Sequence, residues 1–189
     1  NFSLSQPGIY ELTVSAIDQA NNSASASSQI TVYQKDEQTN LTVNDTNIDS
    51  SASTKSALRL RSNQTLQANV SILSSRSKPS SIATSLPRAI THKTVILSQN
   101  LQDSLQWAVL SIYYDDEDIS ELEESSLVMA RYNESSDEWV NLSAELWYVF
   151  ETGHDTDNNR IWANVSQFST YAVTGSEPQE EVQEESGSS

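Results

Sequence analysis

Apolar and polar residues alternate along most of this chain, and this alternation constrains the fold more than any other feature. In the stretch QTLQANVSILS, Leu66, Ala68, Val70 and Ile72 fall on one face of an extended strand, because successive side chains point to opposite sides. Similar stretches recur, separated by short segments rich in Ser, Asn and Asp. Such a series of short strands predicts an all-β fold, here an Ig-like β-sandwich.

The first 33 residues predict only part of a domain. PGIYELTVSAID and SQITVY both alternate, and the turn QANNSA separates them. Two strands cannot bury a core by themselves. We therefore expect residues 1–33 to be the closing hairpin of a truncated Ig-like repeat whose other strands precede Asn1. Residues 34–56 are polar and predict a linker, or a linker that opens the next domain, with at most a short strand over 41–43.

Residues 57–175 predict a more complete sandwich. SLQWAVLSIYY is apolar on both faces, which indicates a strand in the middle of a sheet. SLVMARY with WVNLS, and ELWYVFE with RIWANV, predict two hairpins, and FSTYAVTG predicts the final strand. SSRSKPSSIATSLPRAITHK, with two prolines, predicts a long surface loop. We expect one short helix in DDEDISELEESS, with Ile119 and Leu122 facing inward.

Charge and composition exclude several classes of function. The formal net charge of −16 would repel nucleic acids and anionic membranes. The chain has no Cys, so it has no disulfide, no thiol nucleophile and no Cys-zinc site. No apolar run approaches the length of a membrane span, so we expect membrane contact only through an anchor outside this segment. Residues 176–189, rich in Glu, predict a disordered acidic stalk.

Acceptor sequences for N-glycosylation, Asn-x-Ser/Thr, are frequent. They can arise by accident in a polar surface rich in Ser and Asn. Their number exceeds the chance expectation, however, and this excess predicts a secreted, N-glycosylated protein. The acceptors are Asn1, Asn21, Asn40, Asn44, Asn63, Asn69, Asn133, Asn141 and Asn164.

Two segments resemble modules of surface proteins. YELTVSAIDQANNSASASSQITV is similar to the closing hairpin of polycystic-kidney-disease-type Ig-like repeats of bacteria and archaea. LEESSLVMARYNESSDEWVNL and DTDNNRIWANVSQFSTYAV resemble a module found near the C-termini of archaeal cell-surface proteins, notably those of methanogens, and this likeness covers residues 57–175. The resemblance implies an extracellular, non-enzymatic structural or spacer module of a cell-surface glycoprotein, with other cell-envelope proteins or glycans as its partners.

Calcium is the one candidate cofactor. The segment HDTDNN places Asp155, Asp157 and Asn159 at alternating positions, as in the first half of a calcium loop. Arg160 stands where such a loop needs glycine, and the distal Glu is absent. A hairpin turn rich in Asx residues is the alternative interpretation.

No catalytic pattern is apparent, and we expect no enzymatic activity. His92 and His154 have no partner pattern in the sequence. The dipeptide Phe168-Ser169 resembles the cleavage point of self-cleaving β-sandwich domains, but Gln167 stands where those domains have a His. An amide cannot act as a general base near neutral pH.

Carbohydrate or protein binding is the alternative function. Trp147 and Trp162 are candidates for stacking against a ligand, although Trp in strands usually packs in a core. The solvent exposure of Trp147 and Trp162 distinguishes a binding module from a structural module. A flat, solvent-facing pair favours binding, and burial favours a structural module.

Overall fold

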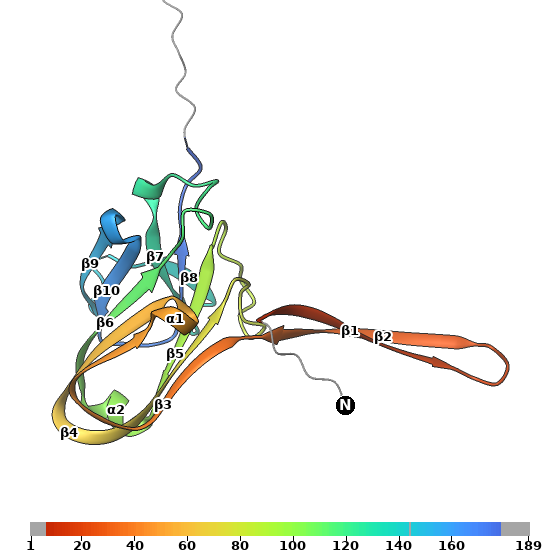
Figure 1. Cartoon of the computed structure of the whole chain (residues 1–189), viewed down its shortest axis with the longest axis horizontal. Coiled ribbons are helices and arrows are strands. Elements are labelled where there is room, and N and C mark those ends of the chain that lie inside the picture. The colour runs from red at the N-terminus through yellow and green to blue at the C-terminus, as the bar shows by residue number, and fades with distance from the viewer. Residues whose placement is uncertain (1–6, 144, 179–189) are drawn as a thin grey trace, which may run out of the picture.

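The computed structural model describes residues 7–143 and 145–178 and confirms an all-β fold (Figure 1). β1 (Gly8–Ile17) and β2 (Ser23–Val32) form a two-stranded antiparallel sheet. The other nine strands form one sheet in the order β8-β7-β11-β5-β4-β6-β10-β9, with β3 also paired to β4. Figure 1 shows the β1–β2 hairpin projecting from the body as a long arm.

All strand pairs of the larger sheet are antiparallel. Its strands are β3 (Gln34–Ser50), β4 (Ser56–Ser75), β5 (Thr91–Leu97), β6 (Leu105–Tyr113), β7 (Val128–Asn133), β8 (Glu138–Asn141), β9 (Val149–Asp155), β10 (Arg160–Val165) and β11 (Thr170–Thr174). The described helices are short: α1 (Ser51–Thr54), α2 (Gln99–Ser104) and 3₁₀ turns at Glu124–Ser126 and Thr156–Asn158.

Two long strands, β3 and β4, connect the two halves of this sheet. One half contains β5, β11, β7 and β8, and the other contains β6, β10 and β9. The first part of β4, 56–62, pairs with β6, and its last part, 70–75, pairs with β5. β3 runs beside β4 along most of its length, with register shifts at Gln38/Leu41 and Val43/Asp45. Such bulges let a strand bend. The bent pair folds the sheet into a sandwich-like body, in which corners are made by strands that pass from one layer to the other.

The predicted strands occur, and they bury the predicted faces. Ala68, Val70 and Ile72 are buried on β4, whereas Gln67 and Asn69 are exposed. β6, expected in the middle of a sheet, lies between β4 and β10. The hairpin β7–β8 and the final strand β11 also form as expected. The hairpin β9–β10 forms as well, but β9 covers Val149–Asp155 instead of the predicted 145–151, and residues 145–148 form a turn. Local alternation was therefore sufficient to find these strands.

The prediction of a polar linker over 34–56 is wrong. β3 occupies most of that segment, and Val43 and Ile48 are only 0% and 5% exposed. β3 pairs with β4 alone among the described strands, so its other side and outer face meet water. An edge strand needs few apolar residues, and its composition therefore resembles that of a linker. After it, α1 and Lys55, in the left-handed conformation (φ 48), reverse the chain into β4.

The short helix expected in DDEDISELEESS is also misplaced. Residues 116–121 form turns, and only Glu124–Ser126 forms a 3₁₀ turn. Ile119 is nevertheless buried, and Leu122 packs against the core as expected. Closely spaced carboxylates repel one another in a helix. Here Asp118 instead makes ion pairs with distant residues.

The surface loop predicted over 74–93 is shorter in the structure: residues 76–90 have no regular structure, but 74–75 end β4 and 91–93 begin β5. Ile82 within the loop is buried. At the start of the acidic tail, the Ser176 carbonyl accepts a hydrogen bond from the Glu123 amide (2.8 Å), and Glu177 pairs with Arg88 (2.6 Å). These described residues of the tail are thus held against the body, and the remainder of the predicted tail lies outside the described residues. In the described part, no helix has the length and apolar character needed to cross a membrane.

Candidate functional site

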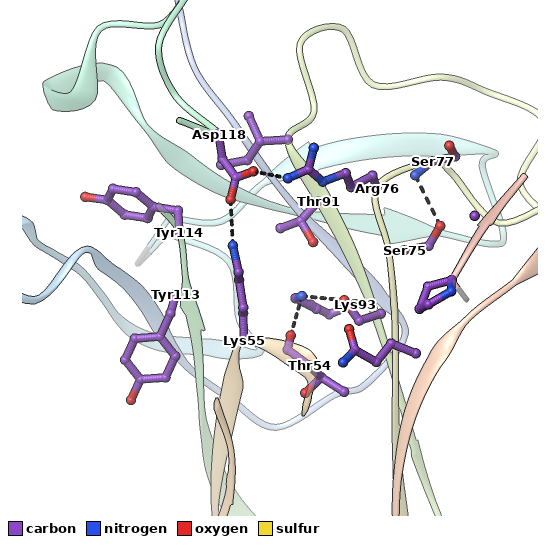
Figure 2. Close-up of a pocket in the computed structure, with 15 residues that line it drawn as sticks. Thr54, Lys55, Ser75, Arg76, Ser77, Thr91, Lys93, Tyr113, Tyr114 and Asp118 are labelled. Atoms are coloured by element: carbon purple, nitrogen blue, oxygen red, sulfur yellow. Dashed lines mark hydrogen bonds and ion pairs between the residues drawn. The ribbon is translucent and has the colours of Figure 1, made fainter. Parts of the chain in front are cut away.

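A hollow of about 250 Å³ lies where the base of the β1–β2 arm meets the body (Figure 2). Segments far apart in the sequence form its wall: Pro7 and Gly8 before and in β1, the end of α1, and the ends of β4 and β6. Its charged lining residues are Lys55, Arg76, Lys93 and Asp118. We call this site the cation-lined hollow.

Lys93 is the most unusual residue of the hollow, because it is a lysine only 2% exposed. It lies on β5 in phase with the buried Val95 and Leu97, at a position where alternation calls for an apolar side chain. Its Nζ donates to the Thr54 carbonyl and to Ser74 Oγ (2.6 Å), which are both neutral acceptors. Burial, followed by the nearby Lys55 charge, lowers the pKa of Lys93 to about 7.

Asp118 lies between two other cations of the hollow, as Figure 2 shows. Lys55 Nζ is 3.0 Å from Asp118 Oδ2, and an Arg76 guanidinium nitrogen is 2.7 Å from Oδ1. Burial raises the pKa of Asp118, but the hydrogen bond from Lys55 and the two positive charges outweigh it and hold the pKa below its usual value. Lys55 also pairs with Asp115. Lys55 and Arg76 are therefore paired with carboxylates, whereas Lys93 contacts only neutral groups within the described residues.

An open groove of about 680 Å³ contains Trp147, the first candidate stacking residue. Trp147 is 78% exposed and rests edge-on against Tyr148, with ring centroids 5.6 Å apart. The Arg131 guanidinium lies over the Tyr148 ring at 5.0 Å. We call this the Trp147 groove; polar residues also line it, namely Gln99, Gln102, Asp103, Asn133, Ser135, Ser166 and Gln167.

Trp162, the second candidate, lies outside this groove and is half-buried. It sits on β10 opposite Gly153 of β9. A Cβ atom at Gly153 would be 2.5 Å from the Trp162 ring, so the glycine leaves the space that the indole fills. The structure therefore does not bring the two tryptophans together as one exposed pair. Trp162 packs within the fold, and Trp147 alone faces solvent.

The other two tryptophans pack within the fold. Arg59 lies over the Trp107 ring at 5.4 Å. Trp139 contacts the rings of His92 and Tyr132, with centroids 5.7 and 5.5 Å away, and its indole N–H donates to the Thr84 carbonyl (3.0 Å). Such contacts are those of structural rather than ligand-stacking aromatic residues.

The calcium prediction for Asp155, Asp157 and Asn159 has no support in this geometry. The Asp155 carboxylate caps the following turn, accepting from the Asn158 amide (3.3 Å) and side chain (3.0 Å), and it pairs with Arg160 (3.1 Å). Asn159 is in the left-handed conformation of a hairpin turn (φ 47). Within residues 7–143 and 145–178, no three His, Cys, Asp or Glu side chains are grouped closely enough to hold a metal ion. The Asx-rich turn is the better interpretation.

The two histidines lie on different strands, His92 on β5 and His154 on β9, and no partner for either could be predicted from the sequence. His154 Nε2 is 2.7 Å from the Tyr114 hydroxyl, which donates to Glu124 (2.7 Å). Burial of the Tyr114 hydroxyl and the Glu124 charge raise the pKa of this tyrosine. Ser169 is buried and its hydroxyl donates to the Tyr132 carbonyl (2.9 Å). These contacts tie strands and loops together, and the sequence carries no signal for them because the partners are far apart in the chain.

The predicted glycosylation acceptors differ in exposure. Asn133 and Asn164 are half-buried, and the Asn164 side-chain oxygen is fully enclosed. Asn1 lies outside the described residues. The exposed acceptors are Asn21, Asn40, Asn44, Asn63, Asn69 and Asn141.

Comparison of this chain with protein-family models, with curated proteins and with solved structures finds no match. The likenesses to polycystic-kidney-disease-type repeats and to archaeal surface modules therefore stay predictions from the sequence.

Proposed function

We propose that this chain is an extracellular, glycosylated spacer segment of a cell-surface protein and that it carries out no catalysis. In this proposal the β1–β2 hairpin ends one Ig-like repeat, and the nine-stranded body is an Ig-like sandwich module of the archaeal surface type. The segment would hold other domains at a distance from the cell envelope. Its partners would be other envelope proteins or glycans.

The observation that carries the proposal is the separate two-stranded sheet that β1 and β2 form. The two strands pair over ten residues each, yet they pair with no other described strand. Val14 and Ile17 are 63% and 69% exposed. A hairpin with exposed apolar side chains is marginal in water. Packing against a further module would cover these side chains, and this supports an arrangement of consecutive modules.

The positions of the exposed acceptors support a glycan coat. Asn40 and Asn44 lie on β3, and Asn63 and Asn69 lie on β4, the two long strands of the body. β3 is an edge strand, and an exposed edge can pair with the strands of another chain. Glycans on β3 would block such pairing, so they would keep neighbouring surface proteins separate.

We expect glycans on the exposed acceptors and few or none on Asn133 and Asn164, because a transferase must reach the amide nitrogen from solvent. The measurement is peptide mass spectrometry of the protein purified from the cells that make it, with enzymatic removal of glycans marking each occupied Asn. Glycan-free peptides at every exposed acceptor would contradict the glycoprotein proposal. Equal occupancy at half-buried and exposed sites would contradict the link to exposure.

A second candidate function is carbohydrate binding at the Trp147 groove. An exposed indole beside amides, a carboxylate and a guanidinium suits a sugar, because the ring stacks on C–H groups while polar side chains bind hydroxyls. Only one of the two candidate tryptophans has this exposure. The spacer function therefore remains the main proposal.

If the groove binds glycans, Trp147→Ala should abolish the signal of the protein on a glycan array, whereas Phe150→Ala should retain it. Phe150 is an exposed aromatic residue that does not line the groove, so it is the matched control. Both variants should unfold within about 0.5 kcal/mol of the wild type, since both side chains are exposed. Absence of any wild-type signal, or equal loss in both variants, would exclude this function.

A further inference from the structure

We propose that the cation-lined hollow binds a small tetrahedral oxyanion, sulfate or phosphate, either free or as a monoester. This inference is independent of the spacer proposal. It rests on the convergence of three cations, on the burial of Lys93, and on the hydroxyl groups around it.

The concentration of positive charge is the first argument. The whole chain has ten Lys and Arg against 26 Asp and Glu. Three of those ten cations line this one hollow, and Asp118 is the carboxylate among its lining residues. Asp118 pairs with Lys55 and Arg76, and Asp115 also pairs with Lys55, so the positive charge here that lacks a carboxylate partner among the described residues is that of protonated Lys93. Exposed charges farther apart than about 10 Å are largely screened at 0.1 M salt. Carboxylates farther away than this therefore repel an anion in the hollow only weakly.

The burial of Lys93 is the second argument. A buried charge is unfavourable unless it is paired and hydrogen-bonded. The ion pairs of the hollow involve Lys55 and Arg76, and both contacts of Lys93 Nζ go to neutral oxygens. An ammonium group has three N–H donors. With two directed at Thr54 and Ser74, the third can donate to a ligand, and an anion would supply the missing negative charge.

The size and chemistry of the wall give the third argument. Ser74, Ser75, Ser77 and Thr91, which carry hydroxyl groups, line the hollow together with the cations. Hydroxyls and cations together are the donors that oxyanions accept. The volume of about 250 Å³ is smaller than the roughly 300–1,000 Å³ of pockets for drug-sized ligands. The hollow therefore suits a small ion or a single esterified group.

The experiment is a titration of the full chain with sodium sulfate at constant ionic strength, with chloride replaced and calorimetry or thermal unfolding as the readout. We expect saturable binding to the wild type. Lys93→Met and Arg76→Gln should each weaken it about tenfold or more, because each removes a charge-assisted hydrogen bond. Lys35→Met, which removes an exposed lysine outside the hollow, is the matched control and should bind as the wild type does.

Two further arms sharpen the test. Inorganic phosphate and glucose 6-sulfate, titrated separately, distinguish a free ion from an ester, and either result supports an oxyanion site.

Sulfate should bind more tightly at pH 6 than at pH 8.5, because Lys93 is protonated at the lower pH. The other charged groups that line the hollow with Lys93 are Lys55, Arg76 and Asp118, and the neighbouring titratable group on β5 is His92, whose side chain lies on the opposite side of the strand. The Lys93→Met variant should lose the part of this pH dependence that Lys93 causes, and any part that His92 causes should remain in the variant.

A non-saturable stabilisation that is equal in all variants would be a general salt effect, and it would overturn the proposal. Absence of a difference between sulfate and chloride would also overturn it. If Lys93→Met does not fold, Arg76→Gln decides the question. The Arg76 side chain is 81% exposed, so its replacement leaves the fold intact.

Discussion

Raising the pH from 7 to 9.5 should increase the free energy of unfolding by about 3 kcal/mol through Lys93 alone. The pKa of this lysine is about 7 in the folded protein, against an ordinary value of 10.5. Between these values the unfolded chain binds more protons than the folded chain. Stability due to Lys93 therefore rises with pH in this window, and it is constant below the window, where both states are protonated.

The measurement is urea unfolding of the wild type and of Lys93→Met at a series of pH values, in buffers free of sulfate and phosphate. The difference between the two proteins isolates Lys93. The pKa of His92 is lowered by burial, so its effect falls at or below neutral pH. Tyr114 and Tyr171 have raised pKa values, so they act above the window. Parallel stability curves for the two proteins would contradict the assignment.

At pH 6 the same variant should be more stable than the wild type, because it no longer buries an ammonium group beside Lys55. The gain is reduced by the loss of hydrogen bonds to Thr54 and Ser74. This comparison also bears on the oxyanion site. If an anion pairs with Lys93, added sulfate at pH 6 should stabilise the wild type, so the difference in free energy of unfolding between Lys93→Met and the wild type should become smaller.

The substitution Val43→Asp should destabilise the protein by about 4 kcal/mol or more, because it places a carboxylate in the core without a partner. Val43 is fully buried on β3, in the segment whose composition predicts a linker. Asn44→Asp introduces the same group one position along the chain on the exposed side, so its effect should be within about 0.5 kcal/mol. Chemical denaturation of both variants is the measurement.

The pair of variants distinguishes a strand from a linker. In a linker both carboxylates would be hydrated, and the two variants would have the same stability. A large effect of both would mean that charge anywhere on β3 is disruptive, for example by repulsion from Asp45. Only the contrast between Val43 and Asn44 shows that this strand has a buried face.

Most strands of the body could be predicted because the evidence for them is local. Burial on one face of a strand requires apolar residues at every second position, and β4, β6 and β10 satisfy this requirement within a few residues. β3 does not, because an edge strand with a solvated outer face needs only a few apolar contacts such as Val43 and Ile48. Its position was set by pairing with β4.

The candidate site was less predictable, since its residues come from distant segments. Lys93 could have been noticed as a lysine in phase with Val95 and Leu97, but its neighbours Lys55 and Arg76 lie on other elements. Trp147 and Trp162 both occur in apolar aromatic runs. Their different exposure depends on Gly153, which leaves room for one indole, and on the turn that leaves the other in solvent.

Alternation along the chain was thus enough to establish an all-β body and the inward faces of most of its strands, because side-chain direction in a strand follows from the backbone alone. It could not establish which strands are neighbours, that β3 and β4 bend through both halves, or that three cations meet beside Asp118. Those features depend on contacts between residues far apart in sequence. Such contacts are selected by the packing of the whole sheet and leave no periodic signal in any one segment.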